Sequence, residues 1–571
     1  MLSGSKKTPP AALLRRLPFP SMTMKERMPV LIPLACGLLL LAGLLLLLPD
    51  SLFSGLRGNG GRGAGEGDAE RITGSPQEIE NKAAGATRDP NAELLARLLM
   101  MLADKDAKAN EAVLQFKDAE AMREFLARAD AAGLKVLGTL DKLNAVRVGY
   151  DDLRRLRDEL RDHAGDYAGF GANYYVYMPE VPTEDRPQQR EVGFGEGALA
   201  FMGVKGDFST WGKGITIAIL DSGVVAHSAF AQGRVRSVDI GQGLTGTGEN
   251  DGHGTAVASL AGGTAPGATG VAPASDLLSI RVTNAEGVSD LFTLAQGIMA
   301  AVDNGAKVIN ISLGSYENSG VLTRAITYAD ERGTIIVAAG GNDQAANLTW
   351  PAADPRVISV GAVDLLGQQV TFSNSGENLS ITAPGLGLST AWPGDQIVSF
   401  DGTSGSAPLM AGAIAAVMSQ IPGMTARDAA NLLATYSADA GAPGQDPGYG
   451  YGTVDLGYAF NHANPQYTDT TVASHYFNSD LGRVEFVVQN RSGHPVEGLT
   501  LNVTTGGVRD SVSVPALSAG QLWSYNVQVD EARLNAVSEI TYTSQLRNPI
   551  GLVDQNPGNN ARASVVFKVG E

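Results

Sequence analysis

Three short runs of mostly apolar residues constrain the fold of this chain more than any other feature. They cover residues 215–220, 307–311 and 334–339. Runs of this length and composition predict strands buried on both faces, as in parallel sheets. Between the first two runs, residues 291–302 carry apolar side chains at helical spacing, and Gly305 follows as a stop signal. Strands that alternate with helices predict a doubly wound α/β domain with a mostly parallel sheet, which we place at residues 191–463. Ligands of such domains bind at the carboxyl ends of the strands.

The segment before this domain, residues 93–190, has a different pattern. Residues 113–116 and 146–150 read as strands, and 174–177 as a further extended run. Met122 and Leu153 each lie at the start of a helical repeat of apolar residues. The order strand, helix, strand, strand, helix, strand is a split βαβ pattern and predicts a ferredoxin-like α+β domain.

The last part of the chain, residues 464–571, is predicted to be all β. Short β-prone runs are separated by Gly, Pro and Asn, and they cover residues 484–488, 499–503, 512–514 and 563–569. This spacing favours an immunoglobulin-like sandwich of two sheets.

The N-terminal part predicts export from the cytoplasm. Residues 1–28 are basic, and residues 29–49 are apolar throughout. About 20 such residues span a bilayer as a helix, and positive charges before the span keep the N-terminus inside. We therefore expect a single-pass anchor in the cell membrane, or secretion after processing. A cleavable signal peptide is the alternative, although its apolar core is usually shorter. Residues 50–92 follow as a flexible linker.

Charge and cysteine content exclude several classes of function. The net charge of −17 argues against a nucleic-acid partner, because phosphate binding needs a basic surface. The single cysteine, Cys36, lies in the apolar segment. The rest of the chain therefore has no disulfide, no thiolate metal site and no cysteine nucleophile.

Three short motifs contain the residues of a candidate nucleophilic site. Asp221 ends a buried strand in Leu-Asp-Ser-Gly, and His253 opens a helical pattern in Asp-Gly-His-Gly-Thr. Ser404, in Gly-Thr-Ser-Gly-Ser-Ala-Pro, precedes a long apolar stretch. A serine hydroxyl is a weak nucleophile until an imidazole takes its proton, and a carboxylate must orient that imidazole. Each motif alone is common in turns and loops, so the argument depends on all three together.

Residues of about 198–463 resemble the catalytic domain of the subtilisin family of serine peptidases, which carries its triad in the order Asp, His, Ser. The matching blocks cover residues 217–223, 253–258, 270–273, 311–314, 338–342, 383–385, 402–412 and 450–455. The resemblance implies a serine endopeptidase that acts on proteins or peptides. It implies that Asp221 orients His253, that His253 is the general base and acid, and that Ser404 is the nucleophile.

The same resemblance assigns the residues around the substrate. Asn342 matches the side-chain donor of the oxyanion hole, with the backbone N–H of Ser404 as the second donor. The segment Ser312-Leu313-Gly314 matches the strand that pairs with the substrate backbone and lines the first specificity pocket. We expect Gly287 and Ser289 to lie on the opposite substrate-binding segment.

The regions before and after the catalytic domain resemble domains that accompany subtilisin catalytic domains in other proteins. Residues 113–182 are similar to the subtilisin propeptide, which implies an autoprocessed zymogen whose own propeptide is a partner, cut between residues 178 and 198. The C-terminal region resembles CARDB-type adhesion modules, with a plain spacer as the alternative.

The family's high-affinity calcium site is not matched in this sequence. Its carboxylates are lacking in His227-Ser228-Ala229-Phe230 and in the short loop 262–267. We therefore predict no metal at that site and no required cofactor, and leave calcium elsewhere open.

Two other functions remain as alternatives. The first is a catalytically silent protein that keeps the fold and binds peptides. The second is a surface adhesion protein whose function lies in the C-terminal module. An α/β-hydrolase esterase fits poorly, because Ser406 replaces the second glycine of the Gly-x-Ser-x-Gly motif.

Overall fold

The structure is a computed structural model that describes residues 104–180, 191–243 and 251–568, together with Ala96, Leu98, Met100 and Met101. The predicted basic segment 1–28, the apolar span 29–49 and the linker 50–92 lie outside these residues. Within the described ranges, no helix has both the length and the apolar character needed to cross a membrane.

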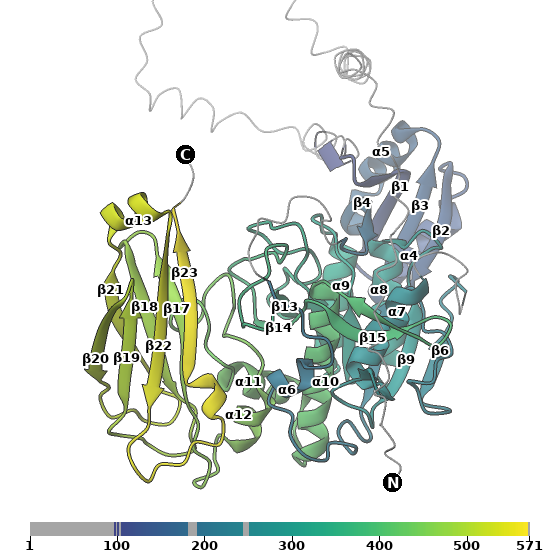
Figure 1. The fold of residues 1–571 in the computed structure, drawn as a ribbon. Coiled ribbons are helices and arrows are strands. Elements are labelled where there is room, and N and C mark those ends of the chain that lie inside the picture. The colour runs from purple at the N-terminus through teal and green to yellow at the C-terminus, as the bar shows by residue number, and fades with distance from the viewer. Residues whose placement is uncertain are drawn as a thin grey trace, which may run out of the picture. The chain divides into compact units, whose positions relative to one another are not determined.

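A parallel sheet of seven strands forms the middle of the α/β region (Figure 1). Its strand order is β14-β13-β12-β11-β5-β9-β6, and every neighbouring pair is parallel. The strands are β5 (Thr216–Asp221), β6 (Val235–Val238), β9 (Asp276–Arg281), β11 (Val308–Ile311), β12 (Ile335–Ala339), β13 (Ile358–Val363) and β14 (Ile381–Pro384). The three predicted apolar runs are β5, β11 and β12, so the predicted doubly wound sheet is confirmed.

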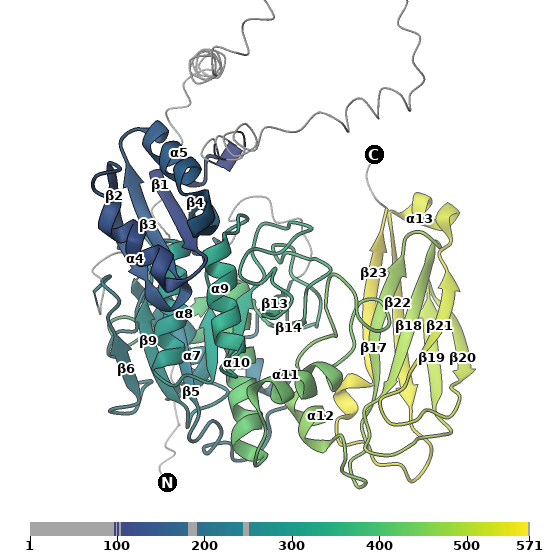
Figure 2. The ribbon, with the colours of Figure 1, turned by 180° about the vertical axis from the view of Figure 1, so that it is seen from behind.

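Helices cover both faces of this sheet (Figures 1 and 2). The helices α7 (Asp251–Gly262) and α10 (Thr403–Gln420) share one buried cluster with Ile217 and Ile219 of β5. The helices α8 (Leu291–Asp303) and α9 (Gly320–Asp330) share a second cluster with Ala218 and Leu220. Successive residues of one strand thus enter opposite layers, which explains why the strand sequence is continuously apolar.

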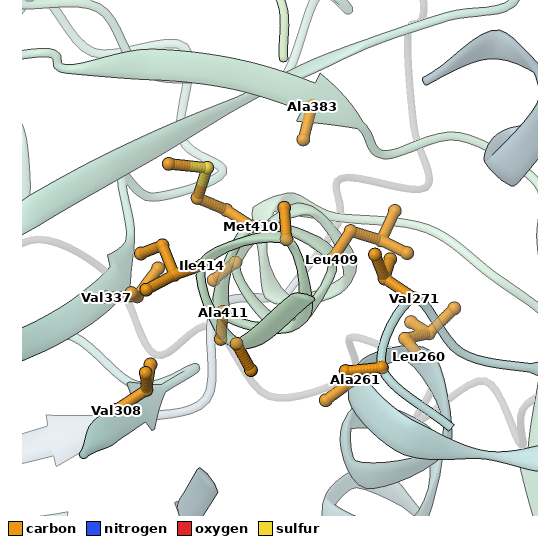
Figure 3. Close-up of a cluster of buried hydrophobic side chains, with 14 of the residues drawn as sticks. Leu260, Ala261, Val271, Val308, Val337, Ala383, Leu409, Met410, Ala411 and Ile414 are labelled. Carbon is orange, nitrogen blue, oxygen red and sulfur yellow. The ribbon is translucent and has the colours of Figure 1, made fainter. Parts of the chain in front are cut away.

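Helix α10 is buried along most of its length. All its residues from Thr403 to Val417 are buried. Side chains of α7 and of the strands β11, β12 and β14 surround it (Figure 3). Because interiors are packed as densely as crystals, such a helix has little freedom to shift. The burial therefore fixes the position of the residues at its N-terminus, which include Ser404.

A second sheet, antiparallel throughout, is formed by the residues before the α/β region. Its elements are β1 (Ala107–Phe116), α4 (Ala119–Arg128), β2 (Leu134–Leu140), β3 (Ala145–Tyr150), α5 (Leu153–Asp162) and β4 (Tyr167–Tyr177). The strand order β4-β1-β3-β2 confirms the predicted ferredoxin-like pattern. One face packs on α4 and α5, and residues of the other face, such as Val113 and Ala172, share the cluster of α8 and α9.

The short strand β10 (Val288–Asp290) of the α/β region extends this sheet beyond β4. Its pairing with β4 is antiparallel and joins two parts of the chain that are more than 100 residues apart in sequence. Ser289 was predicted to lie beside the substrate, whereas its pairing with β4 was not predicted. The strand therefore links the ferredoxin-like sheet to the candidate substrate-binding segment.

The C-terminal region consists of two antiparallel sheets. One contains β17 (Thr470–Asn478), β18 (Arg483–Asn490) and β21 (Leu522–Gln528), and the other contains β19 (Thr500–Thr505), β20 (Val508–Ser513), β22 (Glu539–Arg547) and β23 (Ala561–Phe567). Phe486 of the first sheet and Tyr542 of the second share one buried cluster. The predicted all-β sandwich is confirmed as a fold.

Buried polar contacts connect this sandwich to the α/β region. Arg491 Nη1 lies 3.2 Å from Asp455 Oδ2, and both residues are buried. Arg562 donates to the carbonyl oxygens of Ala473 and Leu366. The backbone N–H of Asp439 lies 3.4 Å from Gln489 Oε1, and burial raises the pKa of the Asp439 carboxyl to about 7. The sandwich and the α/β region thus share a polar interior.

The remaining elements are short. They are α6 (Ala198–Phe201), β7 (Thr264–Ala265), β8 (Ala268–Thr269), β15 (Leu388–Trp392), β16 (Gln396–Phe400), α11 (Ala426–Thr435), α12 (Leu456–Asn461) and α13 (Glu531–Val537). The domain boundaries predicted after residues 92, 190 and 463 stay predictions.

Candidate active site

Asp221 and His253 are joined by a hydrogen bond at the carboxyl end of β5, an interior strand of the parallel sheet. Asp221 is the last residue of β5 and is completely buried, and Ser222 donates its N–H to the Asp221 Oδ1 at 2.7 Å. His253, in the first turn of α7, has its Nδ1 2.8 Å from Oδ1 and 3.0 Å from Oδ2 of Asp221. The carboxylate therefore holds the imidazole through Nδ1, which leaves Nε2 as the nitrogen that can exchange a proton.

The glycine after His253 allows this close approach. A Cβ atom at Gly254 would lie 2.3 Å from the carbonyl oxygen of Gly223 and 3.2 Å from Cβ of Asp221. Any larger residue would push α7 away from the end of β5. The contact between His253 and Asp221 therefore requires glycine at position 254.

Ser404 lies at the N-terminus of α10 and is covered. It is 1 % exposed, and its Oγ has no hydrogen-bond partner among the described residues. Its carbonyl oxygen accepts a hydrogen bond of 3.0 Å from the Oγ of Ser312. Gly402, the N-cap residue of α10 two positions before Ser404, has a φ of +125°, which a residue with a side chain rarely adopts. The serine thus sits where the helix potential is positive and favours a developing oxyanion.

Asn342 is oriented by two hydrogen bonds from Thr403. The N–H of Thr403 donates to the Asn342 Oδ1 at 3.0 Å, and its Oγ1 donates to the same atom at 2.8 Å. With Oδ1 engaged in this way, Nδ2 is free to donate elsewhere, and it donates to the carbonyl oxygen of Pro179 at 3.1 Å. Thr403 was not singled out from the sequence, although it stands next to Ser404 in the same motif.

An extended segment of the chain itself lies between the two predicted substrate-binding segments. Tyr177 exchanges two backbone hydrogen bonds of 2.9 Å with Gly314. On the other side, Val176 pairs with Ser289 and Tyr175 pairs with Asp290. The segment is a strand up to Tyr177, where β4 ends, and two residues further on the carbonyl of Pro179 accepts from Asn342.

The other predicted substrate-binding residues have more indirect positions. Leu313 is completely buried, and Ser312 contacts the carbonyl of Ser404. Gly287, with a φ of +78°, lies in the turn before β10 and donates its N–H to the carbonyl oxygen of Asn284. Gly314 and Ser289 are thus the two predicted residues that pair directly with the extended segment.

The segments 227–230 and 262–267, where calcium ligands were predicted to be missing, make direct hydrogen bonds to the rest of the protein and to each other. Ser228 donates its N–H to Asp395 Oδ1 at 2.7 Å, and His227 Nε2 lies 3.1 Å from the carbonyl oxygen of Gln396. The carbonyl oxygen of Ala229 accepts from the N–H of Thr264 at 2.8 Å. In the part of the chain that the structure describes, no group of three or more His, Cys, Asp or Glu side chains is arranged to hold a metal ion.

Comparison with known proteins supports the interpretation of this site. The model of the subtilase family matches residues 212–452, a range that includes Asp221, His253, Asn342 and Ser404. The chain is 34 % identical over 247 residues to subtilisin BL of Lederbergia lenta, which covers 43 % of this chain and 90 % of that protein. It is 35 % identical over 254 residues to a thermostable alkaline protease of Halalkalibacterium halodurans, with coverages of 44 % and 68 %. The chain belongs to the subtilase family. It is a subtilisin-like serine endopeptidase.

Solved structures show that the fold of this subtilase is shared over a larger part of the chain. Fervidolysin of Fervidobacterium pennivorans, described as a keratinolytic enzyme related to subtilisin, has a TM-score of 0.54 and 20 % identity, and covers 82 % of this chain and 77 % of its own. The epidermin leader peptide processing serine protease of Staphylococcus aureus has a TM-score of 0.52 and 20 % identity, with coverages of 62 % and 98 %. Both likenesses concern the fold.

Proposed function

We propose that this subtilase hydrolyses peptide bonds of proteins outside the cytoplasm, with Ser404 as the nucleophile. The observation that carries the proposal is the position of the Pro179 carbonyl, which accepts a hydrogen bond from Asn342 beside the covered Ser404. A peptide carbonyl thereby contacts a donor whose other end is held by Thr403, the residue next to the proposed nucleophile. Such an arrangement is what an acyl-transfer site requires.

The proposed reaction follows from the roles of four side chains. Ser404 Oγ attacks the carbonyl carbon while His253 Nε2 takes its proton, and Asp221 stabilises the resulting imidazolium. Asn342 Nδ2 donates to the oxyanion of the tetrahedral intermediate, with the N–H of Ser404 as a second donor. His253 then gives the proton to the leaving amine as the C–N bond breaks. Water, activated by the same imidazole, hydrolyses the acyl-enzyme.

A serine-directed fluorophosphonate probe tests this function. We expect the probe to label the mature enzyme, and peptide mapping to locate the label on Ser404. His253→Ala should prevent labelling, because the hydroxyl loses its base. A folded protein that binds peptides but takes up no label would instead be the catalytically silent alternative.

We further propose that residues 93–190 act as an inhibitory propeptide and that the protein is made as a zymogen. Support comes from residues 175–177 at the end of β4, which pair with β10 on one side and with Gly314 on the other, where a substrate would pair. In this register the bond presented to Ser404 is Pro179–Glu180. Because the predicted span 29–49 precedes this bond, one cut would release the enzyme both from inhibition and from a membrane anchor or signal segment.

Expression of the full-length chain in a membrane-containing host tests the zymogen proposal. We expect a soluble enzyme that begins at or near Glu180, identified by N-terminal sequencing. Ser404→Ala should stay full-length in the membrane fraction, because the cut depends on the enzyme's own nucleophile. Active, uncleaved enzyme in the membrane would contradict the proposal, while the assignment of Ser404 would survive.

No metal cofactor is required in the proposed mechanism. Because direct hydrogen bonds hold the segments around His227 and Thr264, we expect EDTA to change the melting temperature only modestly. A tightly bound calcium ion would stabilise the folded state by mass action, so its removal would lower the melting temperature strongly. A large fall that calcium restores would contradict this prediction and indicate a site elsewhere.

The function of the C-terminal sandwich stays a prediction. Its resemblance to adhesion modules favours binding to a surface component, and the spacer role is the alternative, because a fold does not determine a function.

A further inference from the structure

An acidic residue at the end of β10 is held by two cations from outside the α/β region. Asp290 is 5 % exposed, and its Oδ2 accepts hydrogen bonds from Lys108 Nζ at 3.0 Å and from Arg147 Nη1 at 3.2 Å. Lys108 belongs to β1 and Arg147 to β3, both in the ferredoxin-like sheet. The other carboxylate oxygen, Oδ1, caps α8 by accepting from the N–H of Thr293 at 2.8 Å.

Removal of the ferredoxin-like sheet would leave this carboxylate without its cations. Burial raises the pKa of Asp290, but the charges of Lys108 and Arg147 and the bonded N–H of Thr293 outweigh it, and the pKa lies below its ordinary value. Asp290 is therefore ionised in the inhibited form. A largely buried carboxylate that loses its counter-charges needs a new cation or water.

The pairing of β10 with the extended segment shows where a new cation would come from. Asp290 is directly opposite Tyr175, the fifth residue before the Pro179–Glu180 bond. Side chains of directly opposite residues in antiparallel strands lie on the same face, with Cβ atoms about 4.5–5.5 Å apart. Lys108 Nζ lies 5.8 Å from the centre of the Tyr175 ring, so this cation occupies the space above position 175.

We propose that Asp290 forms a subsite of the mature enzyme that prefers lysine or arginine at the fifth residue before the cleaved bond. A long cationic side chain at that position would bring its charge to where Lys108 Nζ lies in this structure. Before the propeptide is removed, its Lys108 and Arg147 occupy the subsite and take the place of the cationic side chain of a substrate. The inference rests on the proposed function, because the register is counted from the bond presented to Ser404.

A set of fluorogenic peptides tests the subsite with the enzyme matured from the full-length chain. The peptides share one sequence with a single cleaved bond, checked by mass spectrometry, and differ only at the fifth residue before that bond. Lysine, arginine, norleucine and glutamate are compared there. We expect kcat/KM to be about 3- to 10-fold higher for lysine and arginine than for norleucine, and lower still for glutamate. Added salt should reduce the preference, because screening weakens the ion pair.

Two enzyme variants assign the preference to one carboxylate. Asp290→Asn keeps an oxygen that can cap α8 but removes the charge, so the ratio of lysine to norleucine should fall to about one. Asp303→Asn is the matched control, because Asp303 also binds a propeptide lysine, Lys142 at 2.7 Å, yet lies outside β10. We expect this control to keep the wild-type ratio.

Two results would overturn the Asp290 subsite, and a third would overturn the proposed peptidase function. Equal kcat/KM for lysine and norleucine in the wild type would overturn the subsite. A preference that persists in Asp290→Asn would show that another group causes it, which also overturns the assignment. If the wild type cleaves none of the peptides or other protein substrates, the proposed function fails first.

Discussion

Ser404→Ala is expected to lower the turnover of peptide hydrolysis by about a million-fold while leaving the fold intact. This magnitude is the loss found when the nucleophile of subtilisin itself is removed, and we apply it here by analogy. The hydroxyl of Ser404 has no hydrogen-bond partner among the residues that the structure describes, so its removal breaks no such contact that stabilises α10. The melting temperature should therefore stay close to that of the wild type. Hydrolysis of a protein substrate measures the effect when wild type and variant are compared at equal protein concentration, after an added protease has removed the propeptide of the variant.

Ser406→Ala provides the matched control for this variant. Ser406 lies two residues further along α10 and is also completely buried, but its Oγ donates to the carbonyl oxygens of Ala383 and Pro384. Its loss should lower stability by about 1–3 kcal/mol, because two buried acceptors lose a donor, yet hydrolysis should persist. If Ser404→Ala retained wild-type turnover, the proposed nucleophile would be wrong.

Asn342→Ala is expected to lower kcat by about 100- to 1000-fold with a small change in KM, a magnitude that likewise comes from subtilisin. The reason is that the donor Nδ2 is needed most when the carbonyl oxygen becomes an oxyanion. Kinetics on a fluorogenic peptide separate kcat from KM. A rise in KM with unchanged kcat would mean that Asn342 only binds the ground state.

Thr403→Val refines the same prediction. Valine keeps the shape and the backbone N–H of Thr403 but removes the Oγ1 bond to Asn342 Oδ1. We expect a loss of kcat that is smaller than that of Asn342→Ala, because one of the two orienting bonds remains. Thr403 would then be a positioning residue, and a double variant with Asn342→Ala should show no further loss.

The parts of the fold that could be predicted are those in which burial leaves a pattern in the sequence. Strands β5, β11 and β12 are buried on both faces, so their composition alone indicated a parallel sheet. Met122, which the sequence placed in a helical repeat, lies with Phe125 on the buried face of α4, and Asp118 caps the N-terminus of this helix. In these elements local preference and tertiary burial favour the same structure.

The contacts that were missed depend on pairing between distant segments. Strand β10 has three residues, two of them polar, and only its pairing with β4 makes it a strand. Lys108 and Asp290 are 182 positions apart, and neither belongs to a motif. The four residues of the proposed mechanism were found from sequence motifs, whereas the register that pairs Tyr177 with Gly314 and brings Pro179 to Asn342 follows only from coordinates.

The contacts of the C-terminal sandwich have a practical consequence for shortening this protein. A fragment that ends at residue 463 would retain Asp455, the N-cap of α12, but would lose its partner Arg491. It would also lose Arg562, which donates to the carbonyl of Leu366 beside β13. Truncation of the protein at the end of the peptidase domain is therefore expected to destabilise it. A minimal enzyme for production should retain the chain through β23, because Arg491 and Arg562 both contact residues of the α/β region.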